Sequence, residues 1–103
     1  MTLGSFTADD LFDWLTQRED ILLLDVRNDV EFSRFQVEGP YPFDMVNVPY
    51  MEFIEMEDES VAKVPRGKRV RIVCAKEGSS KYVGEILVNH GFENVAHMQV
   101  GIK

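Results

Sequence analysis

The chain has 103 residues, of which 45% are hydrophobic and 28% are charged, and its formal net charge is −7. This length predicts a single domain, residues 1–103, because a shorter piece would bury too little apolar surface to fold alone. The negative charge argues against nucleic acids and anionic membranes as partners. No apolar run approaches the roughly 18 to 20 residues of a membrane-spanning helix, and the N-terminus has no basic region followed by an apolar stretch. We therefore expect a cytoplasmic protein.

The first third of the chain reads as a helix followed by a buried strand. Thr7 and Asp10 have the spacing of a capping box, which predicts a helix over 8–17. The run 21–26 is almost continuously apolar, which is typical of a parallel strand buried on both faces. Three shorter segments are expected next: a helix over 29–35, a loop over 37–43 and a brief strand over 45–48.

The rest of the chain continues the alternation of helix and strand. We expect one or two helical turns over 50–56, a turn over 65–67 and a second buried strand over 70–74. A longer helix is expected over 82–90, and a last short strand over 94–98. The acidic run 55–59 indicates a solvated surface, and we assign no chemistry to it. His90, near the end of the longer helix, suits an interaction with the helix dipole better than a role as a base. The alternation predicts an α/β domain with a mostly parallel sheet covered on both faces.

Cys74 is the only cysteine, so an internal disulfide is excluded, and we expect neither a metal nor an organic cofactor. It ends the second buried strand, and a loop containing Gly78, Ser79 and Ser80 leads into the next helix. The free N–H groups and the dipole at a helix N-terminus favour negative charge and would stabilise a thiolate or persulfide. The alternative is a buried filler, since free cysteine often behaves as a small hydrophobic residue. Position alone leaves both interpretations open.

Several segments, taken together and in order, resemble the rhodanese-homology family. They are Leu24-Asp25-Val26-Arg27 with Glu31-Phe32, then Asn47-Val48-Pro49, Val73-Cys74 with its loop, and Gly91-Phe92-Glu93-Asn94-Val95. The resemblance covers essentially the whole chain. It implies a three-layer α/β/α fold with a central, mostly parallel sheet. It also implies sulfurtransferase activity, in which a cysteine carries a sulfane sulfur as a persulfide.

Carried onto this sequence, the resemblance makes Cys74 the catalytic residue. The loop residues that would bind the substrate are Ala75, Lys76, Glu77, Gly78, Ser79 and Ser80. The implied partners are a small sulfane-sulfur donor and a thiol or cyanide-like acceptor. Asp25 and Arg27 invite a catalytic interpretation, but we expect a structural ion pair that supports the loop after their strand.

The sequence of this loop favours sulfur transfer over the phosphatase activity of a related group of proteins. Ser79 and Ser80 stand where related dual-specificity cell-cycle phosphatases need an arginine to hold phosphate, which disfavours phosphatase activity. Ala75 replaces the basic residue that follows the cysteine in many thiosulfate-using members, which argues against thiosulfate as the donor. Gly78 is the fifth residue of the loop, whereas many relatives have a glycine at the fourth position.

Two departures from the family pattern keep a second function open. Residues 40–45 are an insertion beside the site, and the family's final helix is absent after Lys103. The second departure indicates a fragment of a longer protein with a fused or partner domain. The alternative function is therefore a non-catalytic binding or regulatory module in which Cys74 is vestigial.

Overall fold

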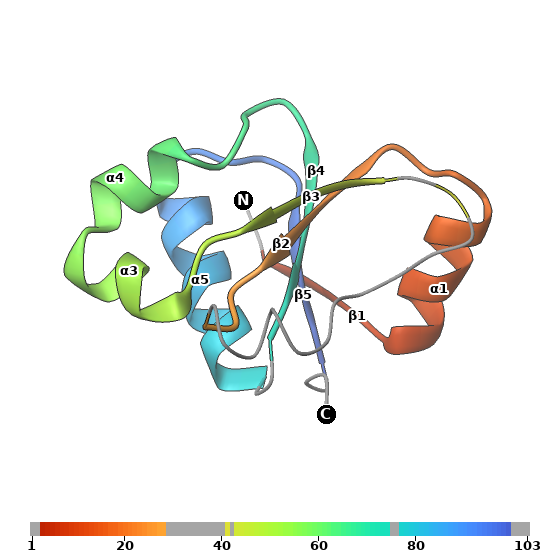
Figure 1. The fold of residues 1–103 in the computed structure, drawn as a ribbon, viewed down its shortest axis with the longest axis horizontal. Helices are drawn as coiled ribbons and strands as arrows, with labels where there is room; N and C mark the ends of the chain where they lie inside the picture. The colour runs from red at the N-terminus through yellow and green to blue at the C-terminus, as the bar shows by residue number, and fades with distance from the viewer. Residues whose placement is uncertain (1–2, 29–40, 42, 75–76, 100–103) are drawn as a thin grey trace.

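Helices lie on both faces of a parallel β-sheet (Figure 1). The computed structural model describes residues 3–28, 41, 43–74 and 77–99. Its elements in chain order are β1 (Gly4–Phe6), α1 (Ala8–Thr16), β2 (Ile21–Asp25), β3 (Asp44–Asn47), α3 (Tyr50–Glu55), α4 (Glu57–Ala62), β4 (Arg69–Val73), α5 (Glu77–Asn89) and β5 (Val95–Met98). Within these residues the five strands have the order β1-β5-β4-β2-β3, and every neighbouring pair is parallel. The predicted α/β class is confirmed.

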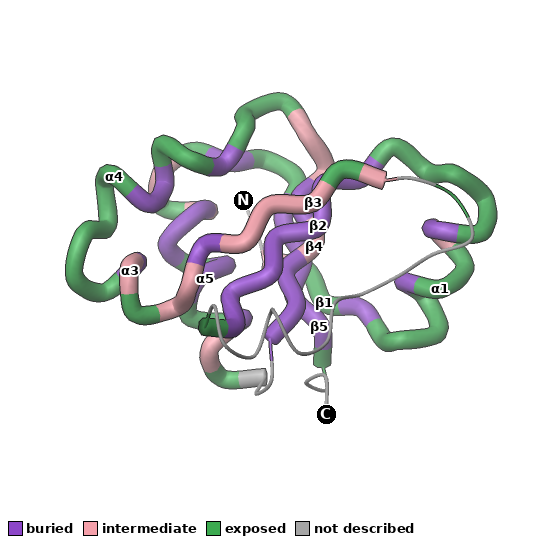
Figure 2. Tube along the Cα trace, viewed as in Figure 1, coloured by how far each residue is buried: buried purple, intermediate pink, exposed green. Residues whose placement is uncertain are grey.

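The strand β2 is buried along its whole length because both of its faces are covered. All five residues of β2 are buried, as Figure 2 shows along this part of the sheet. β2 pairs with β4 on one side and with β3 on the other, and Leu24 lies beside Ile72 of β4. A strand in this position has no solvated face, which explains why 21–26 is a nearly continuous apolar run and not an alternating one.

Two hydrophobic clusters fill the space on the two sides of the sheet, because successive strand residues point to opposite faces. In Figure 1, α3, α4 and α5 lie on one side and α1 on the other. The cluster on the first side includes Leu22, Leu24, Phe53, Val61, Val70, Ile72, Cys74, Val83 and Leu87. The cluster on the α1 side contains Phe6, Leu11, Leu15, Ile21, Leu23, Val73, Ala96 and Met98. Cys74 therefore faces the layer that contains α5.

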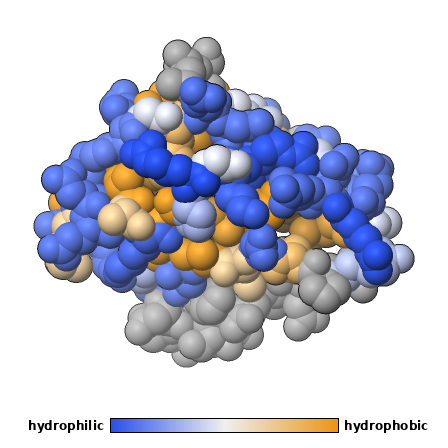
Figure 3. All heavy atoms as spheres, turned by 90° about the horizontal axis from the view of Figure 1, so that it is seen from above, coloured by the Kyte–Doolittle hydropathy of each residue, from blue (hydrophilic) through white to orange (hydrophobic). Residues whose placement is uncertain are grey.

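The surface is mainly hydrophilic, with an apolar area showing between polar side chains in Figure 3. The large hydrophobic side chains that remain exposed are Phe12, Tyr41, Met51, Ile54, Met56 and Tyr82. Met51 and Ile54 belong to α3, and Met56 directly follows it. Among the described residues, no helix is long and apolar enough to span a membrane.

Most predicted elements agree with the observed ones. The segments predicted over 8–17, 21–26, 45–48, 50–56, 70–74 and 94–98 correspond to α1, β2, β3, α3, β4 and β5, with ends that differ by at most one residue. The capping box is present, since Thr7 Oγ1 accepts from Asp10 N at 3.1 Å and Asp10 Oδ2 accepts from Thr7 N at 3.0 Å. The helix expected over 29–35 and most of the loop expected over 37–43 lie outside the described residues.

Two elements were not predicted. β1 has only three residues, too few for a recognisable pattern, and it is stabilised by parallel pairing with the distant β5. The acidic run was interpreted as surface alone, but Glu57, Asp58 and Glu59 form the first turn of α4. Negative charge is favourable there because of the helix dipole. Ser60 and Val61 of the same helix are buried, so α4 is both a solvated surface and part of the core.

Candidate functional site

Cys74 lies at the carboxyl edge of the sheet, where open parallel sheets bind their ligands. It directly follows β4, and the amide of Val26, after β2, donates to the carbonyl of Val73 at 3.0 Å. The ends of the two central strands are therefore held side by side at this edge. The Cys74 side chain belongs to the hydrophobic cluster below α5, and only 5% of the residue is exposed.

Asp25 and Arg27 form a buried ion pair at the same edge. Arg27 Nη2 donates to Asp25 Oδ2 at 2.7 Å, and Arg27 Nε donates to Oδ1 at 3.0 Å. The backbone amide of Arg27 also donates to Asp25 Oδ1 at 3.0 Å. Asp25 is 0% exposed and Arg27 is 4% exposed. This arrangement neutralises both charges and fixes the turn after β2, so its geometry suits positioning of the chain rather than direct catalysis.

The side chain of Asn47 also binds to the turn that contains Asp25 and Arg27, although the sequence did not predict a role for it. The Nδ2 group donates to the carbonyl oxygens of Asp25 at 2.9 Å and of Arg27 at 3.0 Å. Asn47 is the last residue of β3, which pairs with β2, and the amide of Val48 donates to the same Asp25 carbonyl at 3.0 Å. An amide side chain at a strand end was the available signal. The motif Asn47-Val48-Pro49 predicted family membership but gave no role to the Asn47 side chain.

Replacing Asn47 with alanine is expected to loosen the edge beside Cys74. The substitution removes two donated hydrogen bonds and leaves the carbonyl of Arg27 without this partner. We expect the free energy of unfolding to fall by about 1–3 kcal/mol. Urea denaturation measures the change, and Asn89→Ala, at an exposed position in α5, provides the matched control with a change within about 0.5 kcal/mol. If the two substitutions lowered the free energy of unfolding equally, the hydrogen bonds of Asn47 would not stabilise this edge of the sheet.

The segment after Cys74 differs from expectation in the position where its helix begins. Ala75 and Lys76 lie outside the described residues, and α5 already begins at Glu77. The loop predicted to continue through Ser80 is therefore shorter, because Gly78, Ser79 and Ser80 belong to the first helical turn. Serine is compatible with the first turn of a helix. Gly78 is exposed, Ser79 is half-buried and Ser80 is 1% exposed.

This arrangement brings a cysteine close to a helix N-terminus. The first residue of α5 is three positions after Cys74, and the helix has 13 residues. The first turn of a helix presents unpaired N–H groups and the positive end of the dipole, both of which favour an anion.

Arg71 is a positively charged residue of β4 that does not contribute to the site around Cys74. Its Nη2 donates to Asn94 Oδ1 at 3.0 Å, and its guanidinium lies over the Trp14 ring at 5.2 Å. Burial lowers the pKa of Arg71, and the charge of Arg69 lowers it further. Strand alternation places Arg71 on the α1 face, away from the face of Cys74. Arg71 therefore stabilises the packing of α1 against the sheet rather than a ligand at the cysteine.

Comparisons with characterised proteins give relatives of low identity. The chain is 29% identical over 89 residues to "Thiosulfate sulfurtransferase GlpE" from Glaesserella parasuis, covering 86% of this chain and 74% of that protein. It is 29% identical over 104 residues to a tRNA uridine(34) hydroxylase from Bartonella quintana, covering 97% of this chain and 32% of that protein. The chain thus spans about a third of the length of the hydroxylase.

The fold and the whole-chain sequence pattern agree with one another. A rhodanese-related protein from Thermoplasma volcanium superposes with a TM-score of 0.75 at 24% identity, covering 97% of this chain and 87% of that one. The family model described as Rhodanese-like domain matches residues 7–103. The resemblance noted in the sequence is confirmed, and the chain belongs to the rhodanese-like domain family.

Proposed function

We propose that this protein is a sulfurtransferase or sulfur carrier in which Cys74 holds a sulfane sulfur as a persulfide. The observation that carries the proposal is the position of Cys74, directly after a central strand and three residues before α5. Membership of the rhodanese-like family, together with a relative named as a thiosulfate sulfurtransferase, supports the same chemistry.

The proposed reaction has two transfers of one sulfur atom. The Cys74 thiolate attacks the sulfane sulfur of the donor and forms an S–S bond, while the donor's remaining part leaves with the bonding electron pair. If thiosulfate is the donor, the leaving group is sulfite. A nucleophilic acceptor then attacks the outer sulfur of the persulfide, and the Cys74 thiolate is released. Cyanide as the acceptor gives thiocyanate.

The neighbouring residues contribute position and charge. The N-terminus of α5 would stabilise the anionic persulfide, and residues 75–80 would bind the donor. The buried Asp25–Arg27 pair and Asn47 would keep the end of β2 in place beside Cys74. We also propose that the acceptor is either a small thiol or cyanide-like nucleophile, or a group on a fused or partner domain.

An assay of thiocyanate formation from cyanide tests the proposal and identifies the donor. Thiosulfate, mercaptopyruvate and polysulfide are compared, because Ala75 stands where many thiosulfate-using members have a basic residue. We expect at least one donor to give a rate proportional to protein concentration, with thiosulfate not the best of the three. Rates equal to those without protein for all three donors would reject a sulfurtransferase.

A second candidate is a non-catalytic binding or regulatory module, and the burial of Cys74 favours it. With 5% of the residue exposed, Cys74 could be an inert part of the cluster below α5. Alkylation by iodoacetamide, followed by intact mass, distinguishes the two functions. A sulfurtransferase is expected to be alkylated at Cys74 in the native state, whereas the module would be alkylated only after denaturation.

A further inference from the structure

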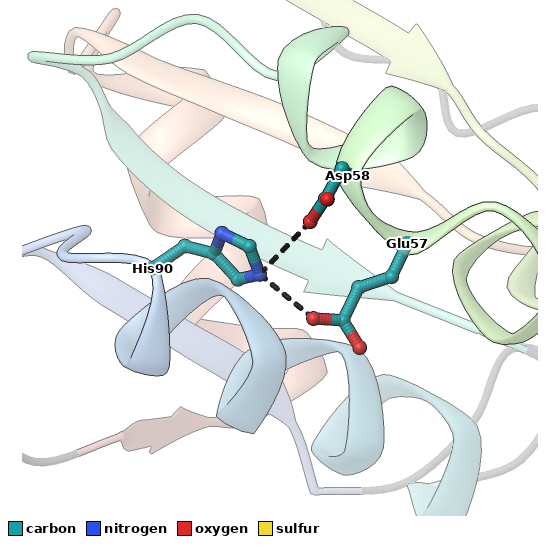
Figure 4. Close-up of side chains that lie close together, drawn as sticks. All are labelled: Glu57, Asp58 and His90. Atoms are coloured by element: carbon teal, nitrogen blue, oxygen red, sulfur yellow. Dashed lines mark hydrogen bonds and ion pairs between the residues drawn. The ribbon is translucent and has the colours of Figure 1, made fainter.

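Three side chains with metal-binding atoms converge at the end of α5 that is remote from Cys74 (Figure 4). Glu57 and Asp58 are the first two residues of α4, and His90 directly follows α5. His90 Nε2 is 2.8 Å from Glu57 Oε2 and 4.0 Å from Asp58 Oδ1. One ligand atom from each residue lies within 4.8 Å of the other two. Two elements that are distant in sequence thus present their ligand atoms to one point.

The spacing of these atoms suits a small transition-metal ion. With bonds of about 2.0–2.1 Å, two ligand atoms around a tetrahedral Zn²⁺ lie about 3.3 Å apart. The distances of 2.8 Å and 4.0 Å fall on either side of this value. Glu57 and Asp58 are exposed and His90 is partly exposed, so small side-chain rotations can equalise the distances without disturbing the core.

The ligand types indicate which ion would bind. Zn²⁺ is bound by both imidazole nitrogen and carboxylate oxygen, and three protein ligands leave the fourth position of a tetrahedral ion open. Calcium and magnesium prefer sites made of oxygen ligands alone. We propose that Glu57, Asp58 and His90 form a Zn²⁺-binding site that links α4 to the end of α5.

The surroundings leave room for a fourth ligand. Asp58 and His90 line a hollow of about 470 Å³, so water or a small anion can reach the ion. Arg66 lines the same hollow, and its positive charge opposes a cation. However, its Nη2 donates to the His90 carbonyl at 2.8 Å and its guanidinium lies over the Phe92 ring at 4.4 Å. These contacts hold Arg66 outside the ligand set, while the two carboxylates balance the charge of the ion.

The site is independent of the proposed sulfur chemistry. The 13 residues of α5 separate its N-terminus, near Cys74, from His90, a length of about 20 Å at 1.5 Å per residue. Failure of the zinc proposal therefore leaves the proposed sulfurtransferase untouched, and the reverse also holds.

Calorimetric titration of the full chain with Zn²⁺ tests the site. All measurements use Cys74→Ala as the background, because a thiolate is itself a strong zinc ligand. We expect one Zn²⁺ per chain, and binding at least tenfold weaker in Glu57→Gln and in His90→Gln. Glu59→Gln removes an exposed acid of the same helix turn outside the cluster, and it is expected to bind Zn²⁺ as the background does.

Two further readouts separate a formed site from loose surface binding. Co²⁺ in place of Zn²⁺ is expected to give the visible absorption of a tetrahedral ion in the background protein and not in Glu57→Gln. Millimolar Mg²⁺ is expected not to displace Zn²⁺. Absence of saturable binding, equal losses in Glu57→Gln and Glu59→Gln, or displacement by Mg²⁺ would each overturn the proposal. Thermal unfolding of each variant without metal confirms that it is folded.

Discussion

Replacing Cys74 with serine is expected to lower the rate of sulfur transfer by at least about 10³-fold, because the hydroxyl cannot form a persulfide. Every step of the proposed reaction passes through Sγ, and the chain has no second cysteine to take its place. The rate is measured as thiocyanate formation with the donor that the wild-type protein prefers. This substitution should have the largest effect on activity of any single change in the chain.

A loss of activity is informative only if the variant is folded. Cys74 is packed in a hydrophobic cluster, so a serine hydroxyl there can cost about 1–3 kcal/mol if it finds no partner. Cys74→Ala removes the thiol without adding a polar group and serves as the second variant. Both variants should keep the far-UV circular dichroism of the wild type and lose transfer equally. Full transfer by a folded Cys74→Ala variant would refute the proposed nucleophile.

Replacing Arg27 with methionine is expected to lower the free energy of unfolding by about 3–5 kcal/mol, because it leaves the Asp25 carboxylate buried without its cation. Asp25 is completely buried and receives hydrogen bonds from both Nε and Nη2 of Arg27. For a domain of this size, such a loss should lower Tm by roughly 12 °C or more. Urea denaturation and thermal unfolding measure it.

An exposed ion pair and a double substitution are the controls for this result. Glu52→Gln breaks the Lys63–Glu52 pair, which has a similar distance of 2.8 Å but lies at the surface, and it should cost less than about 1 kcal/mol. Asp25→Leu combined with Arg27→Met removes both buried charges and should be less destabilising than Arg27→Met alone. If Arg27→Met and Glu52→Gln lowered the free energy of unfolding equally, the buried Asp25–Arg27 pair would not have the stabilising role described here.

The parts of the fold that could be predicted from sequence have local signals. The capping box of Thr7 and Asp10 defined the start of α1, a nearly continuous apolar run identified β2, and a run rich in β-branched residues identified β4. Elements that depend on tertiary contacts were missed or misplaced. The three-residue strand β1 is held by its pairing with β5. The helix α5 begins at Glu77, before the apolar positions that predicted it, and its first turn contains the buried Ser80.

The residues of the candidate site likewise fall into those that the sequence could reveal and those that only the fold brings together. Cys74 could be singled out because it is the only cysteine and follows a buried strand. Asp25 and Arg27 are two residues apart, so a pair was foreseeable from their spacing and opposite charge. The bridging bonds of Asn47 span 20 and 22 residues, and His90 meets Glu57 across 33 residues. No local pattern signals contacts of that length, and only the folded arrangement brings these groups together.

Intact mass spectrometry of the wild-type protein and the Cys74→Ser variant, after incubation with each sulfur donor and then with cyanide, tests the central claim most directly. The account predicts that the wild-type protein gains the mass of one sulfur atom with at least one donor, that cyanide removes it, and that the variant gains nothing. No gain on the wild-type protein with any donor, or an equal gain on the variant, would contradict a persulfide at Cys74.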